Sequence, residues 1–291
     1  MLNYRQIKIR KRLQIVQMNT QKLDRLSALL EGLAPEATLS LPELTSVEFT
    51  ANVDEPCFLM LYLVSQGQVG LQCSDHAYRV DAPALIALRS DRSFSLQGIQ
   101  TDNLEQPIRA KVRLTGPVAS LFLEEFADPR IVALSDDEPA LRLAMSMIKA
   151  ELEAPRCGHP ALLDRAGDIL FIGILRYLVA HPGAKGAGLF NGLADPRIAK
   201  ALVAIHQRPA ANWDLDRLAS EAGMSRTAFA GRFRKVMQRT PGKYLASVRL
   251  ALAQRAVDLG KGLKGAARAA GYANTSALSR ALSKNRVVQI L

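Results

Sequence analysis

Short apolar runs and alternating apolar and polar residues occupy most of residues 44–115. The run at 57–64 is apolar throughout, which is typical of a strand buried on both faces. Further short strands are predicted at 69–73, 77–80, 85–88 and 108–114. Turn residues such as Gly67 and Pro83 separate them. This spacing predicts a small antiparallel β-barrel or sandwich.

Apolar residues at helical spacing occur before and after these strands in the sequence. One helix is expected near 21–32. Further helices are expected at 119–126, 139–153 and 161–180. The last of these is apolar over more than one face, since Ile169, Leu170 and Ile172 do not share one side. We expect one face to pack on the strands and the surplus to pack on a second copy, which gives a homodimer. Burial within a single copy is the alternative.

A helix–glycine–helix pattern occupies residues 215–236. Leu and Ala residues at three- and four-residue spacing share one face before Gly223, which suits a left-handed helix end. Ser225 then stands at an N-cap position. Phe229 and Phe233 form the inner stripe of the second helix, whose other face is left free. This pattern predicts a helix-turn-helix unit.

The pattern recurs at residues 263–284, where Gly271 is the turn and Asn274 the N-cap. Leu278 and Leu282 repeat the inner stripe. Two helix-turn-helix units in one chain are far more specific than one.

Thr240 and Pro241 are suited to the N-cap and first position of a long helix, predicted at 242–259 between the two units. With these elements, residues 195–284 resemble the C-terminal DNA-binding domain of the AraC/XylS family of transcription regulators. The matching positions include Leu218-Ala219, Gly223-Met224-Ser225, Phe229, Phe233, Pro241, Tyr244-Leu245, Arg249, Ala253, Gly271-Tyr272, Ser276 and Ser279-Arg280.

The resemblance implies that the second helix of each unit enters a DNA major groove. The candidate DNA-binding residues are Arg226, Thr227, Ala230, Gly231 and Arg234 in the first unit, and Thr275, Ser276, Ser279 and Arg280 in the second. Ala230 and Gly231 are small, so the first unit is expected to contact phosphates more than bases. The chain departs from the family at Gln238, where the family usually has glycine, and in its last six residues, which lack a Gly-x-x-Pro turn.

The N-terminal strands look like the cupin-type sensor domain that precedes the DNA-binding domain in this family. We therefore expect a two-domain α+β protein. Residues 1–185 would form a cupin-like β-barrel with following helices for effector sensing and dimerisation, 186–194 a linker, and 195–291 an all-α tandem helix-turn-helix domain.

The distribution of charge favours nucleic acid as a partner. Residues 195–291 hold 18 Lys and Arg against 5 Asp and Glu, a balance of +13. Residues 1–194 hold 20 against 22, a balance of −2. A basic domain joined to a near-neutral one is typical of proteins that bind double-stranded DNA.

The residues offer little chemistry for an enzyme. Only four histidines occur, and of these only His76 lies within the predicted strands, whereas a metal site needs several ligands together. A cupin-type metalloenzyme, or a binding protein without DNA, is the alternative, but we predict no catalytic residue, metal or cofactor. The absence of a long apolar run and the three widely spaced cysteines lead us to expect a cytoplasmic protein without a membrane partner.

Cations in the N-terminal half suggest an anionic effector. They include Lys8, Arg10 and Arg12 near the start and Arg89 and Arg92 around a turn. Arg109, Lys111 and Arg113 alternate along one strand and share a face. A solvated face and a basic tail that touches DNA are the alternatives.

The spacing Lys8-x-x-x-Arg12 with Ser93-x-Ser95-x-x-Gly98 looks somewhat like the motifs of PilZ receptors for cyclic-di-GMP. Only Arg12, Ser95 and Gly98 match as written. The resemblance implies a cyclic dinucleotide as the effector, and a sugar or an amine is the other possibility. The whole sequence thus predicts a dimeric, effector-responsive transcription regulator that works with RNA polymerase at promoters. We expect an activator, and a repressor is the alternative.

Overall fold

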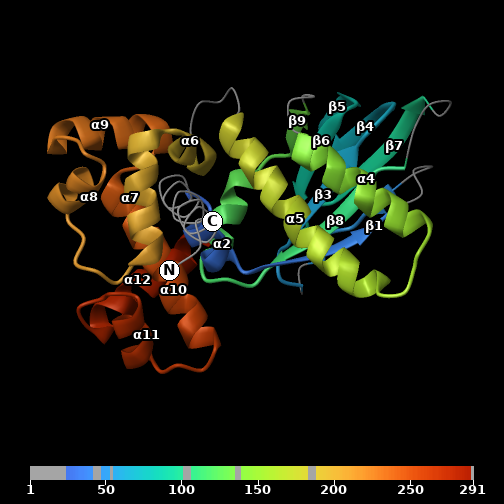
Figure 1. Cartoon of the computed structure of the whole chain (residues 1–291). Coiled ribbons are helices and arrows are strands. Elements are labelled where there is room, and N and C mark those ends of the chain that lie inside the picture. Colours follow the sequence, from blue (N-terminus) through green and yellow to red (C-terminus); the bar gives the residue numbers. More distant parts are fainter. Residues whose placement is uncertain are drawn as a thin grey trace, which may run out of the picture.

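The structure, a computed structural model, describes residues 24–41, 47–52, 55–100, 106–134, 139–182 and 188–289. A β-rich part lies on one side of the molecule and a helical part on the other (Figure 1). The predicted α+β class is confirmed.

Two antiparallel sheets make up the β-rich part. The first has the strand order β1 (Pro35–Ser40), β8 (Ile108–Leu114), β3 (Leu59–Val64), β6 (Ala84–Arg89) and β9 (Arg130–Ala133). The second has the order β2 (Val47–Phe49), β7 (Phe94–Gln100), β4 (Gln68–Cys73) and β5 (His76–Asp81). Apolar residues from both sheets pack together in one core cluster. Among the described strands the arrangement is a two-sheet antiparallel sandwich, one of the two forms that the sequence predicts.

Strand β3 is buried along its whole length, as its apolar run predicts. Met60 and Tyr62 belong to the core between the sheets, whereas Leu59, Leu61 and Leu63 belong to a second core on the opposite face. Side chains alternate between the two faces of a strand, so a strand covered on both sides needs no polar positions.

Helices cover the outer face of the first sheet. The helices α4 (Pro139–Glu153) and α5 (His159–Ala180) and the 3₁₀ turn η1 (Glu124–Phe126) contact its strands, α3 (Ala119–Leu123) packs next to η1, and α2 (Ser27–Leu33) packs next to α3. Helix α5 runs along α4 in front of the sheet (Figure 1) and packs on β1. Most of its apolar residues are buried within the chain, which confirms the longest predicted helix and leaves only a few positions for a partner.

Helix α6 (Leu189–Ala194) lies within the stretch predicted to be a linker, 186–194. Phe190 is fully buried and its ring packs edge-on against Phe122 and Phe126 of the β-rich part. The segment is therefore part of the core. The division into residues 1–185 and 195–291 stays a prediction.

The C-terminal part consists of helices. These are α7 (Pro196–Gln207), α8 (Leu215–Glu221), α9 (Arg226–Met237), α10 (Pro241–Asp258), α11 (Leu263–Ala269) and α12 (Thr275–Gln289). Each predicted helix of the two units is present, and the backbone after residue 284 continues α12 to residue 289.

Candidate nucleic-acid interface

The first unit is built from α8 and α9 in the way that its sequence predicts. Gly223 adopts a φ of 63° between the helices. The hydroxyl of Ser225 accepts a hydrogen bond of 3.4 Å from the Ala228 N–H at the start of α9. Phe229 and Phe233 are fully buried, so they fix which face of α9 points outward.

The opposite face of α9 is open. Arg226, Thr227, Gly231 and Arg234 are exposed, and Ala230 is half-buried. An added Cβ at Gly231 would meet no atom within 4 Å. The Arg226 guanidinium lies 3.2 Å from the Asp216 carboxylate on α8. All five predicted residues therefore share one accessible side of the helix.

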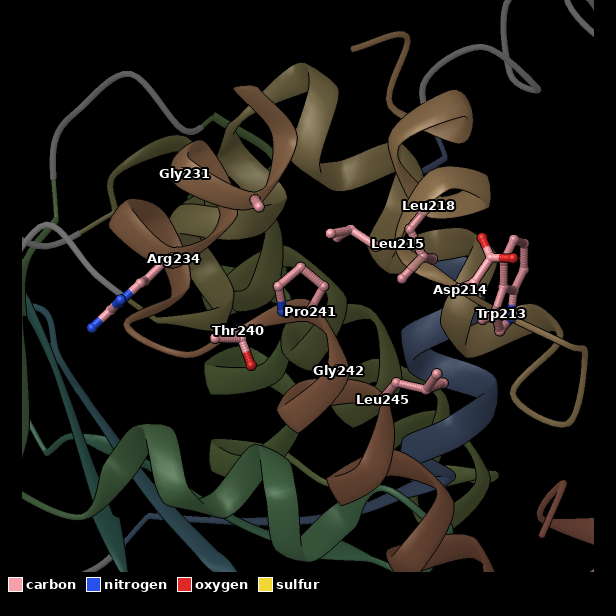
Figure 2. Close-up of a pocket in the computed structure, with 11 residues that line it drawn as sticks. Trp213, Asp214, Leu215, Leu218, Gly231, Arg234, Thr240, Pro241, Gly242 and Leu245 are labelled. Carbon is pink, nitrogen blue, oxygen red and sulfur yellow. The ribbon is translucent and has the colours of Figure 1, made fainter. Parts of the chain in front are cut away.

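A groove of about 530 Å³ runs beside this face, between α8, α9 and the start of α10 (Figure 2). It exists because Ala230 and Gly231 carry almost no side chain on this side of α9. The lining residues are Trp213, Asp214, Leu215, Leu218, Ala230, Gly231, Arg234, Thr240, Pro241, Gly242 and Leu245. A phosphate backbone or a base edge can approach the helix backbone here more closely than a helix with long side chains would allow.

The second unit repeats this geometry in α11 and α12. Gly271 has a φ of 76°, and the Asn274 side chain accepts a 2.8 Å hydrogen bond from the Ala277 N–H. Leu278 is fully buried. On the outer face Ser276, Ser279 and Arg280 are exposed and Thr275 is half-buried. The four predicted residues again lie along one accessible part of the second helix.

Helix α10 holds the two units in a fixed relation. Thr240 accepts a 3.3 Å hydrogen bond from the Lys243 N–H, which confirms the predicted cap. Farther along, the Arg249 guanidinium donates to the Pro209 carbonyl at 2.9 Å and to the Ala211 carbonyl at 2.7 Å. These bonds connect the helix that follows the first unit to the loop that precedes it, and the same helix contacts α11 and α12 of the second unit.

Gln238 stands where the family usually has glycine. It stands at the C-cap of α9 with a φ of 53°, in the left-handed region where glycine is favoured. Next to it the structure reveals cations that the sequence prediction missed. Arg239 and Lys243 line a cavity of about 520 Å³ with Arg234, Gln238 and Thr240. Residues 234–243 hold four cations, which is a visible signal, but no motif marks Arg239 and Lys243.

Of the candidate effector residues, the structure describes those at the turn after β6 and along β7. Lys8, Arg10 and Arg12 lie outside the described residues. Arg89 forms an ion pair with Asp91 at the turn after β6. Arg92 lines a cavity of only about 10 Å³, too small for an organic ligand.

The serines of the same motif have local partners. The Ser93 hydroxyl accepts a 3.0 Å hydrogen bond from the Ala51 N–H. Ser95 and Gly98 lie on β7, paired with Glu48 and Val69 respectively. The sequence motif therefore spreads over the turn before β7 and along this strand.

The alternating cations of β8 lie in a different setting. Arg109 and Lys111 are half-buried and only Arg113 is exposed, so the strand does not carry a fully solvated face. The Arg109 guanidinium donates to the Ser40 hydroxyl at 2.9 Å, and Lys111 lies 4.0 Å from the centre of the Phe58 ring.

Tyr62, opposite Arg109 in the sheet, is buried, and its hydroxyl has no hydrogen-bond partner among the described residues. Burial raises the pKa of Tyr62, and the Arg109 charge opposes that rise. A buried hydroxyl next to a cation is an unusual combination in a sandwich core, because a polar group there normally has a partner.

Neither a metal nor a membrane site is found in the described part of the chain. It contains no group of three or more His, Cys, Asp or Glu residues that could hold a metal ion. None of its helices has the length and apolar character that crossing a bilayer requires.

Known proteins resemble both parts of the chain. Residues 24–180 match the protein-family model described as Cupin, and residues 218–286 match the one described as Helix-turn-helix domain. An AraC-like transcription regulator of Streptomyces lividans is 31% identical over 160 residues, which cover 54% of this chain and 53% of the relative. The HTH-type transcriptional regulator AlkR of Acinetobacter baylyi is 30% identical over 154 residues, which cover 52% and 50%.

The chain thus matches about half the length of these relatives. Among solved structures, ToxT of Vibrio cholerae aligns over 86% of this chain and 93% of its own, with 12% identity and a TM-score of 0.36.

Proposed function

The chain belongs to the AraC-like regulators that join a cupin domain to a helix-turn-helix domain, and we propose that it binds double-stranded DNA through α9 and α12 and regulates transcription. The observation that carries this proposal is that α9 and α12 each have an accessible outer face. Each helix has a buried stripe that orients it and an exposed polar stripe that includes arginine. We also propose that the protein works in the cytoplasm with RNA polymerase, as the sequence predicts.

Arg280 is the sharpest test of base readout, because an arginine on α12 can bind a guanine edge through two hydrogen bonds. Arg280→Ala should weaken binding to the native promoter by about 1–3 kcal/mol and relax specificity at one base pair. Footprinting on native and scrambled promoters measures both effects. Lys261→Ala is the matched control, since it removes an exposed cation from the turn before α11.

Equal losses on both DNAs would show that Arg280 contacts only phosphate. For the wild-type protein, affinity should fall by roughly 10³–10⁵ between 50 and 200 mM salt if about 6–10 phosphates are contacted. Transcription with purified RNA polymerase would then distinguish an activator from a repressor.

The effector belongs to the cupin domain, and an anionic one fits its interior best. Arg109 presents a half-buried cation close enough to lower the pKa of the adjacent Tyr62, whose hydroxyl accepts no hydrogen bond of normal geometry from the described residues. A phosphate or carboxylate oxygen is the group that both would bind. A cyclic dinucleotide such as cyclic-di-GMP is the candidate that the Arg12, Ser95 and Gly98 spacing supports.

Calorimetry with cyclic-di-GMP tests this effector against sugars and amines. Binding that is lost in Arg12→Ala would support the motif, whereas loss in Arg109→Ala and Tyr62→Phe would locate the anion in the sandwich. No heat and no thermal shift with any anion would refute an anionic effector and leave DNA binding untouched.

Dimerisation is proposed through the outer surface of α4 and α5. Three apolar side chains are exposed there, with exposed fractions of 72% for Leu143, 41% for Met147 and 55% for Ile169. Leu143 and Met147 are one helical turn apart, so they form a stripe on α4. Ile172, expected from the sequence at the interface, is half-buried.

The double substitution Leu143→Lys and Met147→Lys should give monomers without unfolding the cupin domain. Sedimentation measures the assembly state, and circular dichroism reports folding. A wild-type protein that is monomeric at high concentration would contradict the proposal.

A further inference from the structure

The junction between α9 and α10 combines three cations with an open cavity. Arg234, Arg239 and Lys243 line a space of about 520 Å³ together with the Gln238 side chain and the Thr240 hydroxyl. Among the described residues, no Asp or Glu lines this space. Guanidinium and ammonium groups arranged around a polar space are suited to bind phosphate oxygens.

The cavity lies beside the proposed DNA-binding face of α9. Arg234 lines both this cavity and the groove along Gly231, and its side chain extends outward from α9, away from Pro241 (Figure 2). When α9 lies in a major groove, the end of the helix comes close to the flanking phosphate backbone. The phosphate that the cavity would bind therefore belongs to the same DNA.

One of the three cations already has an anionic partner from the cupin domain. The Arg239 guanidinium lies 3.2 Å from the Glu124 carboxylate of η1, although the two residues are 115 positions apart. The exposed fractions of the side chains are 33% for Arg239 and 55% for Glu124. The carboxylate thus occupies a position that a phosphate oxygen would take on the same guanidinium.

Glu124 is held in place by the interface around it. The neighbouring Glu125 carboxylate accepts a 2.8 Å hydrogen bond from the Leu189 N–H at the start of α6. Directly before it, the Gly188 N–H donates to the Val236 carbonyl in the last turn of α9, at 2.9 Å. The 3₁₀ turn, α6 and the end of α9 are therefore connected, and the ion pair exists only while the two domains are docked.

We infer that the α9–α10 junction is a binding site for a DNA backbone phosphate, and that Glu124 competes with this phosphate for Arg239. The inference rests on the proposed DNA binding. In the docked arrangement the carboxylate lowers the affinity for DNA, and bound DNA in turn weakens the docking. By linkage, the two effects have the same magnitude.

Binding of a short fluorescent duplex to the full chain at low salt tests this competition. Glu124→Gln removes the competing charge and should tighten binding about two- to five-fold, the range expected for an exposed ion pair. Glu36→Gln removes the same charge from an exposed position on β1 and should have little effect. Arg239→Ala should weaken binding and lower the salt slope by about 1.

The double variant Glu124→Gln/Arg239→Ala should bind like Arg239→Ala alone, because the carboxylate then has no guanidinium to occupy. Arg239→Lys keeps the charge and should bind DNA nearly as well as the wild type, and circular dichroism of each single variant shows whether it remains folded. Tightening by Glu124→Gln that is no larger than that of Glu36→Gln, or that persists without Arg239, overturns the inference while DNA binding stands. A wild-type chain that binds no duplex refutes the proposed function as well.

Discussion

The two helix-turn-helix units turn at equivalent glycines, and the structure predicts very different results for replacing each with alanine. Gly223 and Gly271 have φ angles of 63° and 76°, so either alanine must adopt a left-handed conformation. That conformation costs about 1–2 kcal/mol for a residue with a Cβ. For Gly223 nothing more is expected, because an added Cβ would meet no atom within 4 Å.

At Gly271 the added Cβ would meet backbone. It would lie 2.7 Å from the Cα and 2.9 Å from the carbonyl oxygen of Ala210, in the loop between α7 and α8. Backbone cannot rotate away as a side chain can, so the loop or the second unit must shift, at a further cost of about 1–3 kcal/mol. We expect Gly271→Ala to lower the free energy of unfolding by about 2–5 kcal/mol, against about 1–2 for Gly223→Ala.

Urea denaturation of both variants gives these free energies, and amide exchange shows where the structure opens. In Gly271→Ala the added exchange should be concentrated in α11 and α12, and DNA affinity should fall because the second unit no longer keeps its place. Equal free energies for the two variants would refute the reasoning, since the contact with Ala210 would then have no effect.

Two further predictions concern pH and capping in the C-terminal helices. Burial lowers the pKa of His206 from 6.5 to about 4, so the unfolded chain takes up a proton first and stability should fall by up to about 3 kcal/mol as the pH drops from 6.5 to 4; His206→Gln should flatten this part of the unfolding profile. Burial tends to raise the pKa of Asp195, but hydrogen bonds from the Ile198 and Arg197 N–H groups and the Arg232 charge lower it overall. Its stabilisation is therefore present above the ordinary Asp pKa near 3.9 and lost as the pH falls through the lowered value. At neutral pH, thermal unfolding should show a loss of about 1–2 kcal/mol for Asp195→Ala and a smaller one for Asp195→Asn, which keeps an accepting oxygen.

The helix-turn-helix units were predictable because their signals are local. Ser225, Thr240 and Asn274 each cap the helix that follows within three residues, and Gly223 and Gly271 each have the left-handed backbone that their positions require. A sequence shows such short-range chemistry directly. Which side chains face DNA then follows from the buried stripe opposite.

The cupin domain was less predictable because its strands depend on distant partners. Strand β7 (Phe94–Gln100) is not among the predicted strands because its alternation of apolar and polar residues is short and is interrupted at Gly98; pairing with both β2 and β4 forms it. Residues 186–194, which include α6, are predicted as a linker because glycines precede them. The burial of Phe190 depends on rings some 60 residues away, and local patterns do not reveal it.

Helix α6 also limits how an effector bound in the cupin domain can change the position of the DNA-binding helices. Its aromatic residue packs on the β-rich part, its first N–H binds Glu125, and the Arg25 side chain donates to the Leu193 and Ala194 carbonyls at its end, at 3.0 and 3.2 Å. Both ends of a six-residue helix are thus held by the cupin domain, while the preceding Gly188 is bonded to α9. An effector can change DNA affinity only if it binds the docked and undocked arrangements differently. A ligand that moves η1 or α2 would change DNA affinity through these few polar bonds. A ligand that leaves these bonds intact would leave α9 and its cations in place.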